Sequence, residues 1–211
     1  DVPNVLEDVD VPIAILVLDP QAAQRIAHRH ALDAPAETEI DLESLIEKEP
    51  VTIVLSEKGW IRTMKGHVED AADIKYKDAD AEGFLIKAMT TDKLMLFGTD
   101  GKFYTFDVSA LPGGRGHGEP IRLMADLAND QSIASAFLFQ GGRRFLVASS
   151  SGHGFFVREE ECLGTTRKGK QVLNVKPPDA ARAVAPVEGE LAAAVGENRK
   201  MVIFPLDQVP E

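Results

Sequence analysis

The sequence predicts an all-β fold made of repeated hairpins, with a small acidic strand–helix segment in front of it. The chain has seventeen Gly and twelve Pro among its 211 residues, and this content favours many turns over a helical bundle. One hairpin pattern occurs four times, with turn spacings between 42 and 51 residues. Repeats of this length are typical of folds in which one small sheet per repeat packs against the next. We therefore expect a propeller-like disc of about four blades.

The hairpin pattern consists of an apolar strand, a small residue, two or three polar turn residues and a second apolar strand. Its turn positions are Gly59, Gly101, Gly152 and Asn198, and both residue types tolerate the positive φ that tight turns need. Asp100 followed by Gly101 is a strong hairpin signal. The four stretches are 51–63 (VTIVLSEKGWIRT), 93–108 (KLMLFGTDGKFYTFDV), 144–157 (RFLVASSSGHGFFV) and 191–206 (LAAAVGENRKMVIFPL).

The N-terminal segment has a different pattern. Residues 11–18 (VPIAILVL) are all apolar, as in a short buried strand. Asp19 and Pro20 follow, and these residue types favour the N-cap and the first position of a helix, which we expect over 21–31.

Most of the negative charge lies at the start of the chain. Residues 1–50 contain twelve Asp or Glu and three Lys or Arg, which gives −9 of the net charge of −11. The other residues are nearly balanced, so they can carry a basic face despite the acidic total. We predict an acidic segment over 1–48, which is a linker, a regulatory segment or a fused piece, and a β domain over 49–211.

Composition also bounds the setting and the classes of site. The single cysteine, Cys162, excludes an intramolecular disulfide framework and favours a reducing compartment. No apolar run approaches the ~18 residues that a membrane helix needs, and no basic secretory start is present. We expect a cytoplasmic protein.

Three stretches between or after the hairpins mix Gly with basic residues: 64–67 (MKGH), 113–118 (GGRGHG) and 167–170 (RKGK). Glycine allows a close backbone approach, and cations neutralise phosphate. Loops of this kind that recur once per repeat would place cations along one rim of the disc. The sequence therefore predicts a nucleic-acid contact there.

Four groups of residues resemble the C-terminal domain of the A subunit of bacterial topoisomerase IV. They are 49–56 (EPVTIVLS) with 58–62 (KGWIR) and 65–67 (KGH), then 111–120 (LPGGRGHGEP), 148–155 (ASSSGHGF) and 199–210 (RKMVIFPLDQVP). The related gyrase A subunit has a longer basic glycine box, which 166–171 (TRKGKQ) matches only in part. The resemblance is therefore to topoisomerase IV.

This resemblance implies a β-pinwheel, a propeller-like disc whose outer rim binds and bends DNA. It implies a parent enzyme, an ATP-driven type II topoisomerase with an ATPase B subunit, which performs decatenation, relaxes supercoils and serves chromosome segregation at the nucleoid. The cleavage tyrosine of that family lies in another part of the protein. Tyr76 and Tyr104 have no such context, so we expect no catalytic residue, no metal ligand and no cofactor here.

The DNA-binding candidates are the Lys, Arg and His residues in or beside the turns, the strand starts and the glycine-rich stretches. They are Lys58, Arg62, Lys65, His67, Lys102, Arg115, His117, Arg143, Arg144, Arg167, Lys168, Lys170, Arg199 and Lys200. Duplex DNA is the predicted partner, and contact with phosphates should depend on salt and tolerate any sequence.

The alternative function is a protein-interaction platform, in which the disc binds a regulatory protein or the acidic segment instead of DNA. Removing residues 1–48 and testing DNA binding discriminates the two. Enzyme and metal-site interpretations have less support. Residues 149–152 (SSSG) form a hairpin turn and not the strand-to-helix elbow of a serine hydrolase, and the histidines lack partner cysteines or an HExxH pattern.

Overall fold

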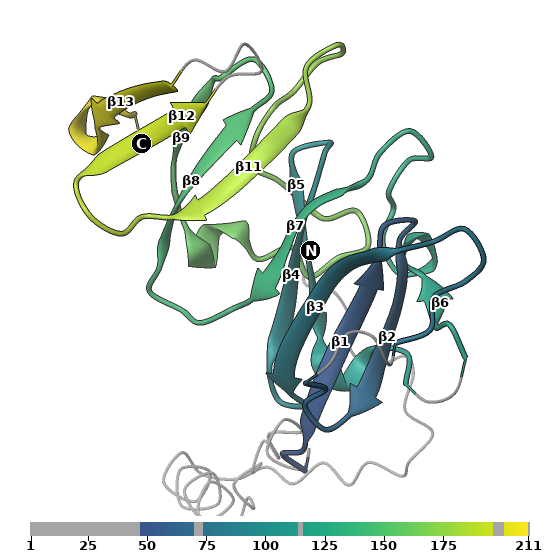
Figure 1. The fold of residues 1–211 in the computed structure, drawn as a ribbon. Helices are drawn as coiled ribbons and strands as arrows, with labels where there is room; N and C mark the ends of the chain where they lie inside the picture. The colour runs from purple at the N-terminus through teal and green to yellow at the C-terminus, as the bar shows by residue number, and fades with distance from the viewer. Residues whose placement is uncertain (1–46, 70–73, 114–115, 196–200, 211) are drawn as a thin grey trace, which may run out of the picture. The chain divides into compact units, whose positions relative to one another are not determined.

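The computed structural model describes residues 47–69, 74–113, 116–195 and 201–210. The chain divides into two units, 1–41 and 42–211, and all described residues belong to the second (Figure 1). The predicted strand and helix before residue 46 lie outside the described ranges. The second unit begins at Leu42, whereas the sequence predicted Glu49. Within the described ranges the regular elements are β-strands and short 3-10 helices, and no helix there is long and apolar enough to span a membrane.

Sheet A has four strands in the order β3–β1–β2–β6 (Figure 1). Its hairpin is formed by β1 (Pro50–Ser56) and β2 (Trp60–Lys65), which pair antiparallel. Strand β3 (Glu82–Met89) pairs with the other edge of β1. The two-residue strand β6 (Glu119–Pro120) arrives from farther along the chain and pairs with β2.

Sheet B repeats this arrangement in the order β10–β5–β4–β7. Strands β4 (Lys93–Gly98) and β5 (Lys102–Asp107) form the hairpin. Strand β7 (Ile133–Leu138) pairs with β4, and the two-residue strand β10 (Lys170–Gln171) pairs with β5.

Sheets C and D complete the described part. Sheet C has the order β11–β8–β9, with β8 (Arg144–Ser149), β9 (Gly154–Arg158) and β11 (Ala181–Pro186). Sheet D is the antiparallel pair of β12 (Leu191–Val195) and β13 (Met201–Pro205). The four predicted hairpins are therefore confirmed. Gly59, Gly101 and Gly152 have φ of 81°, 78° and 85°, as their turn positions require.

Each second hairpin strand in sheets B, C and D is followed by a 3-10 helix. These helices are η3 (Val108–Ala110), η5 (Glu159–Cys162) and η6 (Leu206–Gln208). After η3 and η5 the chain leaves its own sheet and docks on the second hairpin strand of the preceding sheet, through β6 and β10. Consecutive sheets are thus linked by exchanged strands as well as by packed side chains.

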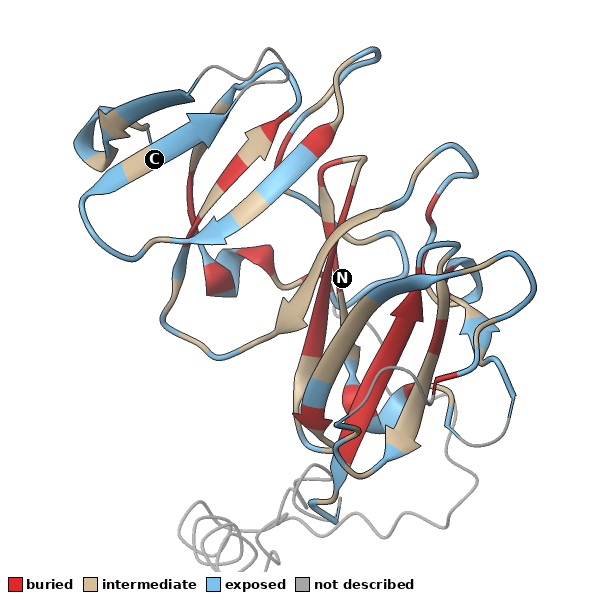
Figure 2. Ribbon diagram, viewed as in Figure 1, coloured by how far each residue is buried: buried red, intermediate tan, exposed pale blue. Residues whose placement is uncertain are grey.

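Two hydrophobic layers lie between the sheets (Figure 2). The first packs sheet A against sheet B and includes Ile53, Leu55 and Leu96, which are at most 1% exposed. The second packs sheet B against sheet C and includes Phe97 and Phe145. Because both faces of β4 are covered, its sequence is a continuous apolar run (LMLF) without polar alternation.

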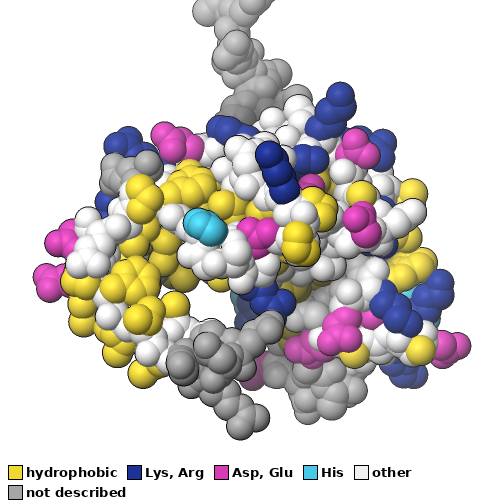
Figure 3. Space-filling model, turned by 90° about the horizontal axis from the view of Figure 1, so that it is seen from above, with side chains coloured by type: hydrophobic (Ala, Val, Ile, Leu, Met, Phe, Trp, Pro, Cys, Tyr) yellow, Lys and Arg dark blue, Asp and Glu magenta, His cyan; other side chains and the backbone are white. Residues whose placement is uncertain are grey.

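One face of sheet D is exposed and apolar. The register places Val195 opposite Met201 and Ala193 opposite Ile203, so these side chains lie on one face of the hairpin. Val195, Met201 and Ile203 are 71%, 63% and 58% exposed. Hydrophobic side chains gather on this side of the molecule in Figure 3, at the left.

A recurring hydrogen-bond clamp fixes the hairpin turns. A residue just before the third strand of a sheet accepts hydrogen bonds from that sheet's turn. Asp80 accepts one from the amide of Lys58 at 3.1 Å, and Gln131 accepts one from the hydroxyl of Thr99 at 2.5 Å. In sheet C, Asp179 accepts from the hydroxyls of Ser150 at 2.5 Å and Ser151 at 2.7 Å.

Asp179→Ala should therefore destabilise the protein in a pH-dependent way. Hydrogen bonds from Ser150 and Ser151 lower the pKa of Asp179 below its ordinary value. A carboxyl with a lowered pKa stabilises the fold above its ordinary pKa of about 4 and loses this contribution as the pH falls further. Thermal melts should show the largest difference from the native chain near neutral pH and a shrinking difference below about pH 4. Asp130→Ala, an exposed acid with no hydrogen bond in the described ranges, should show no such trend.

Candidate nucleic-acid interface

The exchanged strands bring the predicted glycine-rich loops to the outer edges of sheets A and B. We call residues 111–120 crossing segment 1. It runs along β2, where the amide of Thr63 donates to the carbonyl of Pro112 at 2.7 Å. At its end Glu119 lies opposite Ile61 in the sheet register.

Crossing segment 2, residues 163–171, occupies the same position on sheet B. The amide of Thr105 donates to the carbonyl of Gly164 at 2.9 Å, and Lys170 lies opposite Phe103. Thr105 and Phe103 hold the places in β5 that Thr63 and Ile61 hold in β2, counted from Gly101 and Gly59. The predicted loops 113–118 and 167–170 are thus equivalent parts of two consecutive repeats.

Glycine is required where each crossing segment touches the strand. A Cβ on Gly118 would lie 2.1 Å from the carbonyl oxygen of Ile61, and one on Gly164 would lie 2.1 Å from that of Phe103. Neither backbone oxygen can move without disturbing its sheet. The glycines in these loops therefore allow close docking on the edge strand, whatever they do toward a partner.

Gly118→Ala should detach crossing segment 1 from sheet A. The new Cβ would collide with the backbone of β2, and Gly118 has a φ of +85°, which costs an L-residue about 1–2 kcal/mol before the collision is counted. We expect a loss of about 2 kcal/mol or more in the free energy of unfolding, measured by urea denaturation. Gly66→Ala is the matched control, because its φ is +78° but no atom lies within 4 Å of the added Cβ. Equal losses in the two variants would contradict the docking role.

The outer edge of sheet B carries the densest group of cations. Arg167, Lys168 and Lys170 belong to crossing segment 2 and form no ion pair within the described part of the chain. Lys102 lies on the adjacent strand, and its Nζ is 3.4 Å from Oδ2 of Asp100. The carbonyl of Arg167 accepts a hydrogen bond at 2.6 Å from the amide of Asp126.

Asp126 joins the two edges, because it follows crossing segment 1 by only a few residues. The intervening chain forms the 3-10 helix η4 (Ile121–Leu123). The two glycine-rich segments are therefore neighbours on the outer edges of adjacent sheets. His117 lies in crossing segment 1 and is at least partly exposed.

Arg62 holds crossing segment 1 in place. Its guanidinium donates through Nη1 to the carbonyl of Gly116 and through Nη2 to the carbonyl of Lys75 at 3.1 Å. It thus ties two loops to β2 and has fewer donors left for a phosphate.

The stretch 64–67 does not have the position of the other two. Lys65 ends β2, and its Nζ is 3.8 Å from Oε2 of Glu49. The next residues fold back over sheet A, where the carbonyl of Gly66 accepts from the hydroxyl of Thr52 at 2.8 Å. The ring Nε2 of His67 lies 3.2 Å from the carbonyl oxygen of Ala88. The predicted equivalence of all three stretches is therefore wrong for this one.

Arg143 has a structural role and is left out of the interface. Its guanidinium forms an ion pair with the fully buried Glu159, at 2.5 Å, and donates to the carbonyl of Leu138. Arg144, at the start of β8, lies over the ring of Phe156 at 4.7 Å. Both residues lie away from the crossing segments. Arg115, Arg199 and Lys200 lie outside the described residues.

The described residues offer no site for bond chemistry that the sequence missed. They contain no group of three or more His, Cys, Asp and Glu that could hold a metal ion. Tyr104 is fully buried and donates to Asp100 at 2.9 Å, and burial raises its pKa. Burial also raises the pKa of the Cys162 thiol, to about 12, so this thiol is a poor nucleophile.

The crossing geometry and the strand order agree with known proteins. The C-terminal domain of E. coli ParC matches with a TM-score of 0.70 and 28% sequence identity, over 77% of this chain and 67% of that one. The A protein of DNA topoisomerase 4 from Caulobacter vibrioides is 46% identical over 170 residues, which is 81% of this chain. The chain belongs to the topoisomerase IV ParC family, within its C-terminal domain.

The corresponding topoisomerase 4 protein of Rickettsia bellii is 40% identical over 172 residues, which is 82% of this chain. The C-terminal domain of DNA gyrase A shares the fold with a TM-score of 0.57 and 17% identity, over 79% of this chain and 58% of that one. The four sheets are thus blades of a β-pinwheel, as predicted. The chain spans 22% of the length of the Caulobacter protein and 23% of the Rickettsia one. No protein-family model matches the chain.

Sequence reasoning missed cations that lie near the outer edge of sheet A. Lys77 stands over the ring of Trp60, with its Nζ 4.1 Å from the ring centroid. Arg122 follows crossing segment 1 and donates to the carbonyls of Asn129 and Gln131. Neither lies in a glycine-rich stretch, so only the exchanged-strand topology could have pointed to them.

Proposed function

We propose that crossing segments 1 and 2 bind the phosphates of duplex DNA, and that this domain bends the duplex for a type II topoisomerase. The observation that carries the proposal is the repeated placement of glycine-flanked cations on the outer edges of two consecutive blades. The named relatives are DNA topoisomerase proteins, and this supports DNA as the partner. Phosphate contacts of this kind position a protein on DNA without reading its sequence.

The domain would act by selecting DNA geometry for its parent enzyme. Blades arranged in sequence offer phosphate-binding edges one after another, so a bent duplex gains more contacts than a straight one. The rest of ParC and the partner ATPase would supply cleavage and strand passage, including decatenation. No residue of this domain takes a catalytic role in the proposal.

A salt series of duplex binding tests the proposal. If about 6–10 phosphates are neutralised, the affinity should fall by roughly 10³–10⁵ between about 50 and 200 mM salt. The series is run on the whole chain and on a variant without residues 1–48, each checked for folding by circular dichroism. Affinity that does not change with salt would reject phosphate binding and favour a protein-interaction platform. Binding only by the shortened variant would assign an inhibitory role to the acidic segment.

A further inference from the structure

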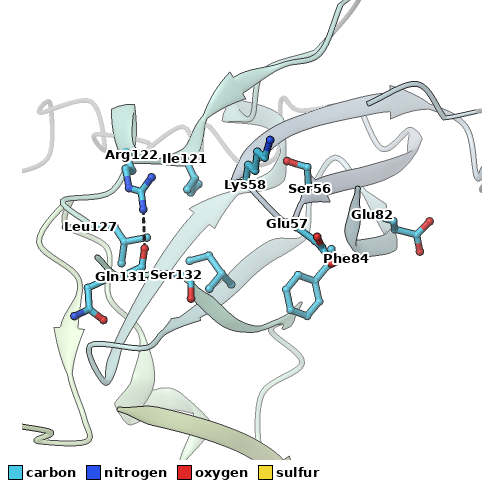
Figure 4. Close-up of a pocket in the computed structure, with 13 residues that line it drawn as sticks. Ser56, Glu57, Lys58, Glu82, Phe84, Ile121, Arg122, Leu127, Gln131 and Ser132 are labelled. Carbon is cyan, nitrogen blue, oxygen red and sulfur yellow. Dashed lines mark hydrogen bonds between the residues drawn. The ribbon is translucent and has the colours of Figure 1, made fainter. Parts of the chain in front are cut away.

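A cavity of about 600 Å³ opens between sheets A and B at the end where their hairpin turns lie (Figure 4). Its walls are the turn 56–59, the start of β3 and the chain between η4 and β7. The floor is apolar and includes Phe84, Ile121, Leu127 and Ile133. A volume of this size suits a small organic ligand.

The next repeat fills the equivalent position, and the sequence explains the difference. Beside sheet A the amide of Ile121 donates to the carbonyl of Gly59 at 2.8 Å, and beside sheet B the amide of Val172 donates to that of Gly101 at 3.1 Å. The following residue is Leu173 in the second case, which is 6% exposed within the core. In the first case it is Arg122, which is exposed. The repeat therefore has a solution that fills this space, and sheet A does not use it.

Arg122 is held in position at the cavity. Its Nη2 donates to the carbonyls of Asn129 at 3.2 Å and Gln131 at 2.7 Å. The other guanidinium nitrogens have no hydrogen bond among the described residues. Lys58 is exposed on the same rim, and its ammonium group forms no ion pair within the described ranges. Two cations with unused donors thus face one apolar floor.

The opposite side of the cavity is acidic. Figure 4 shows Arg122 and Leu127 on one side and Glu82 and Phe84 on the other, with Lys58 between them. Glu57 and Glu82 line that second side. A suitable ligand has an anionic group at one end, a flat apolar body, and hydrogen-bond donors at the other end.

We propose that this cavity binds a nucleoside phosphate. The phosphate would pair with Arg122 and Lys58 through charge-assisted hydrogen bonds. The base would lie on Phe84 and Ile133, and its amino or sugar hydroxyl groups would donate to Glu57 and Glu82. The ligand is either a free mononucleotide or an unpaired nucleotide of a DNA strand. The site is distinct from the duplex-binding edges, and neither proposal depends on the other.

Titration of the whole chain with AMP and dTMP, followed by NMR, tests the site, with a short single-stranded oligonucleotide as a second arm. Arg122→Leu borrows the residue type of the next repeat and should keep the melting temperature at or above that of the native chain. It and Lys58→Ala should weaken mononucleotide binding about tenfold or more, since each removes a charge-assisted contact. Lys176→Ala removes an exposed cation outside the cavity and should leave binding unchanged.

Saturable binding that Arg122→Leu abolishes supports the site, and the arm that binds more tightly identifies the source of the nucleotide. Inorganic phosphate and adenosine are the partial ligands, and each should bind more weakly than AMP. No saturable binding in either arm would overturn the proposal. Binding that survives in both the Arg122→Leu and Lys58→Ala variants would overturn it too, because the nucleotide would then lie elsewhere. Duplex affinity is measured in parallel, so failure here is distinguishable from failure of the edge interface.

Discussion

Replacing Arg167, Lys168 and Lys170 together with Ala should weaken duplex binding about 10²–10³-fold at about 0.1 M salt. All three lie in crossing segment 2, and each phosphate contact contributes roughly 0.9 to the slope of log affinity against log salt. The triple variant should therefore also lower that slope by about 3. Gel-shift titrations at four or more salt concentrations measure both quantities.

The control removes the same charge from the opposite edge of the sheets. Lys87 lies on β3, Arg182 on β11 and Lys176 in the chain leading to β11, and all three are exposed. Strands β3 and β11 are edge strands on the side of their sheets away from the second hairpin strand. Changing these three residues to Ala should alter affinity and slope only slightly. Equal effects of the two triple variants would show that total charge, and not the edge, governs binding.

Arg143→Ala should lower the free energy of unfolding by about 3–5 kcal/mol, because it leaves a buried carboxylate without its partner. Glu159 is 0% exposed and Arg143 is 24% exposed at the side chain. Burial by itself would raise the pKa of Glu159, but hydrogen bonds from Arg143 and from the amides of Gln140 and Gly141 lower it below its ordinary value. A domain of this size should lose about 6–20 °C in melting temperature.

A double variant separates this structural role from DNA contact. Val108 has the place in sheet B that Glu159 has in sheet C, since their amides donate to the carbonyls of Asp92 and Arg143, which occupy matching places before the hairpin. Arg143→Met with Glu159→Val should therefore recover most of the lost stability, as replacement of buried ion pairs by apolar groups often does. This double variant should bind duplex as the native chain does. A melting temperature as low as that of Arg143→Ala, or a loss of duplex affinity at full folding, would contradict the assignment.

The hairpins could be predicted because their signals are local. Gly59, Gly101 and Gly152 sit at turns that need positive φ, and apolar runs flank them, so short-range pattern and backbone chemistry agree. The same reasoning located the glycine-rich loops 113–118 and 167–170. What each loop docks on depends on contacts between distant residues. Strands β6 and β10 are two residues long and have no hydrophobic pattern, so nothing in the local sequence indicates their pairing with the preceding sheets.

The individual cations were harder to assign for the same reason. Arg143 stands beside Arg144 in a polar loop, and only the fold shows that Glu159 is buried against it. The acidic run at 159–161 is typical of a solvated surface, although its first member lies in the core. Arg122 had no glycine beside it and was not predicted. Charge type and spacing thus predicted which segments matter, while the partner of each side chain was set by tertiary packing.

The most direct test is an NMR titration of the chain with a short duplex, in which amide shifts report where the DNA lies. The predicted result is that the shifts concentrate in residues 116–120 and 163–171, on the outer edges of sheets A and B. Shifts concentrated in β3 and β11, or spread evenly over all four sheets, would contradict the account.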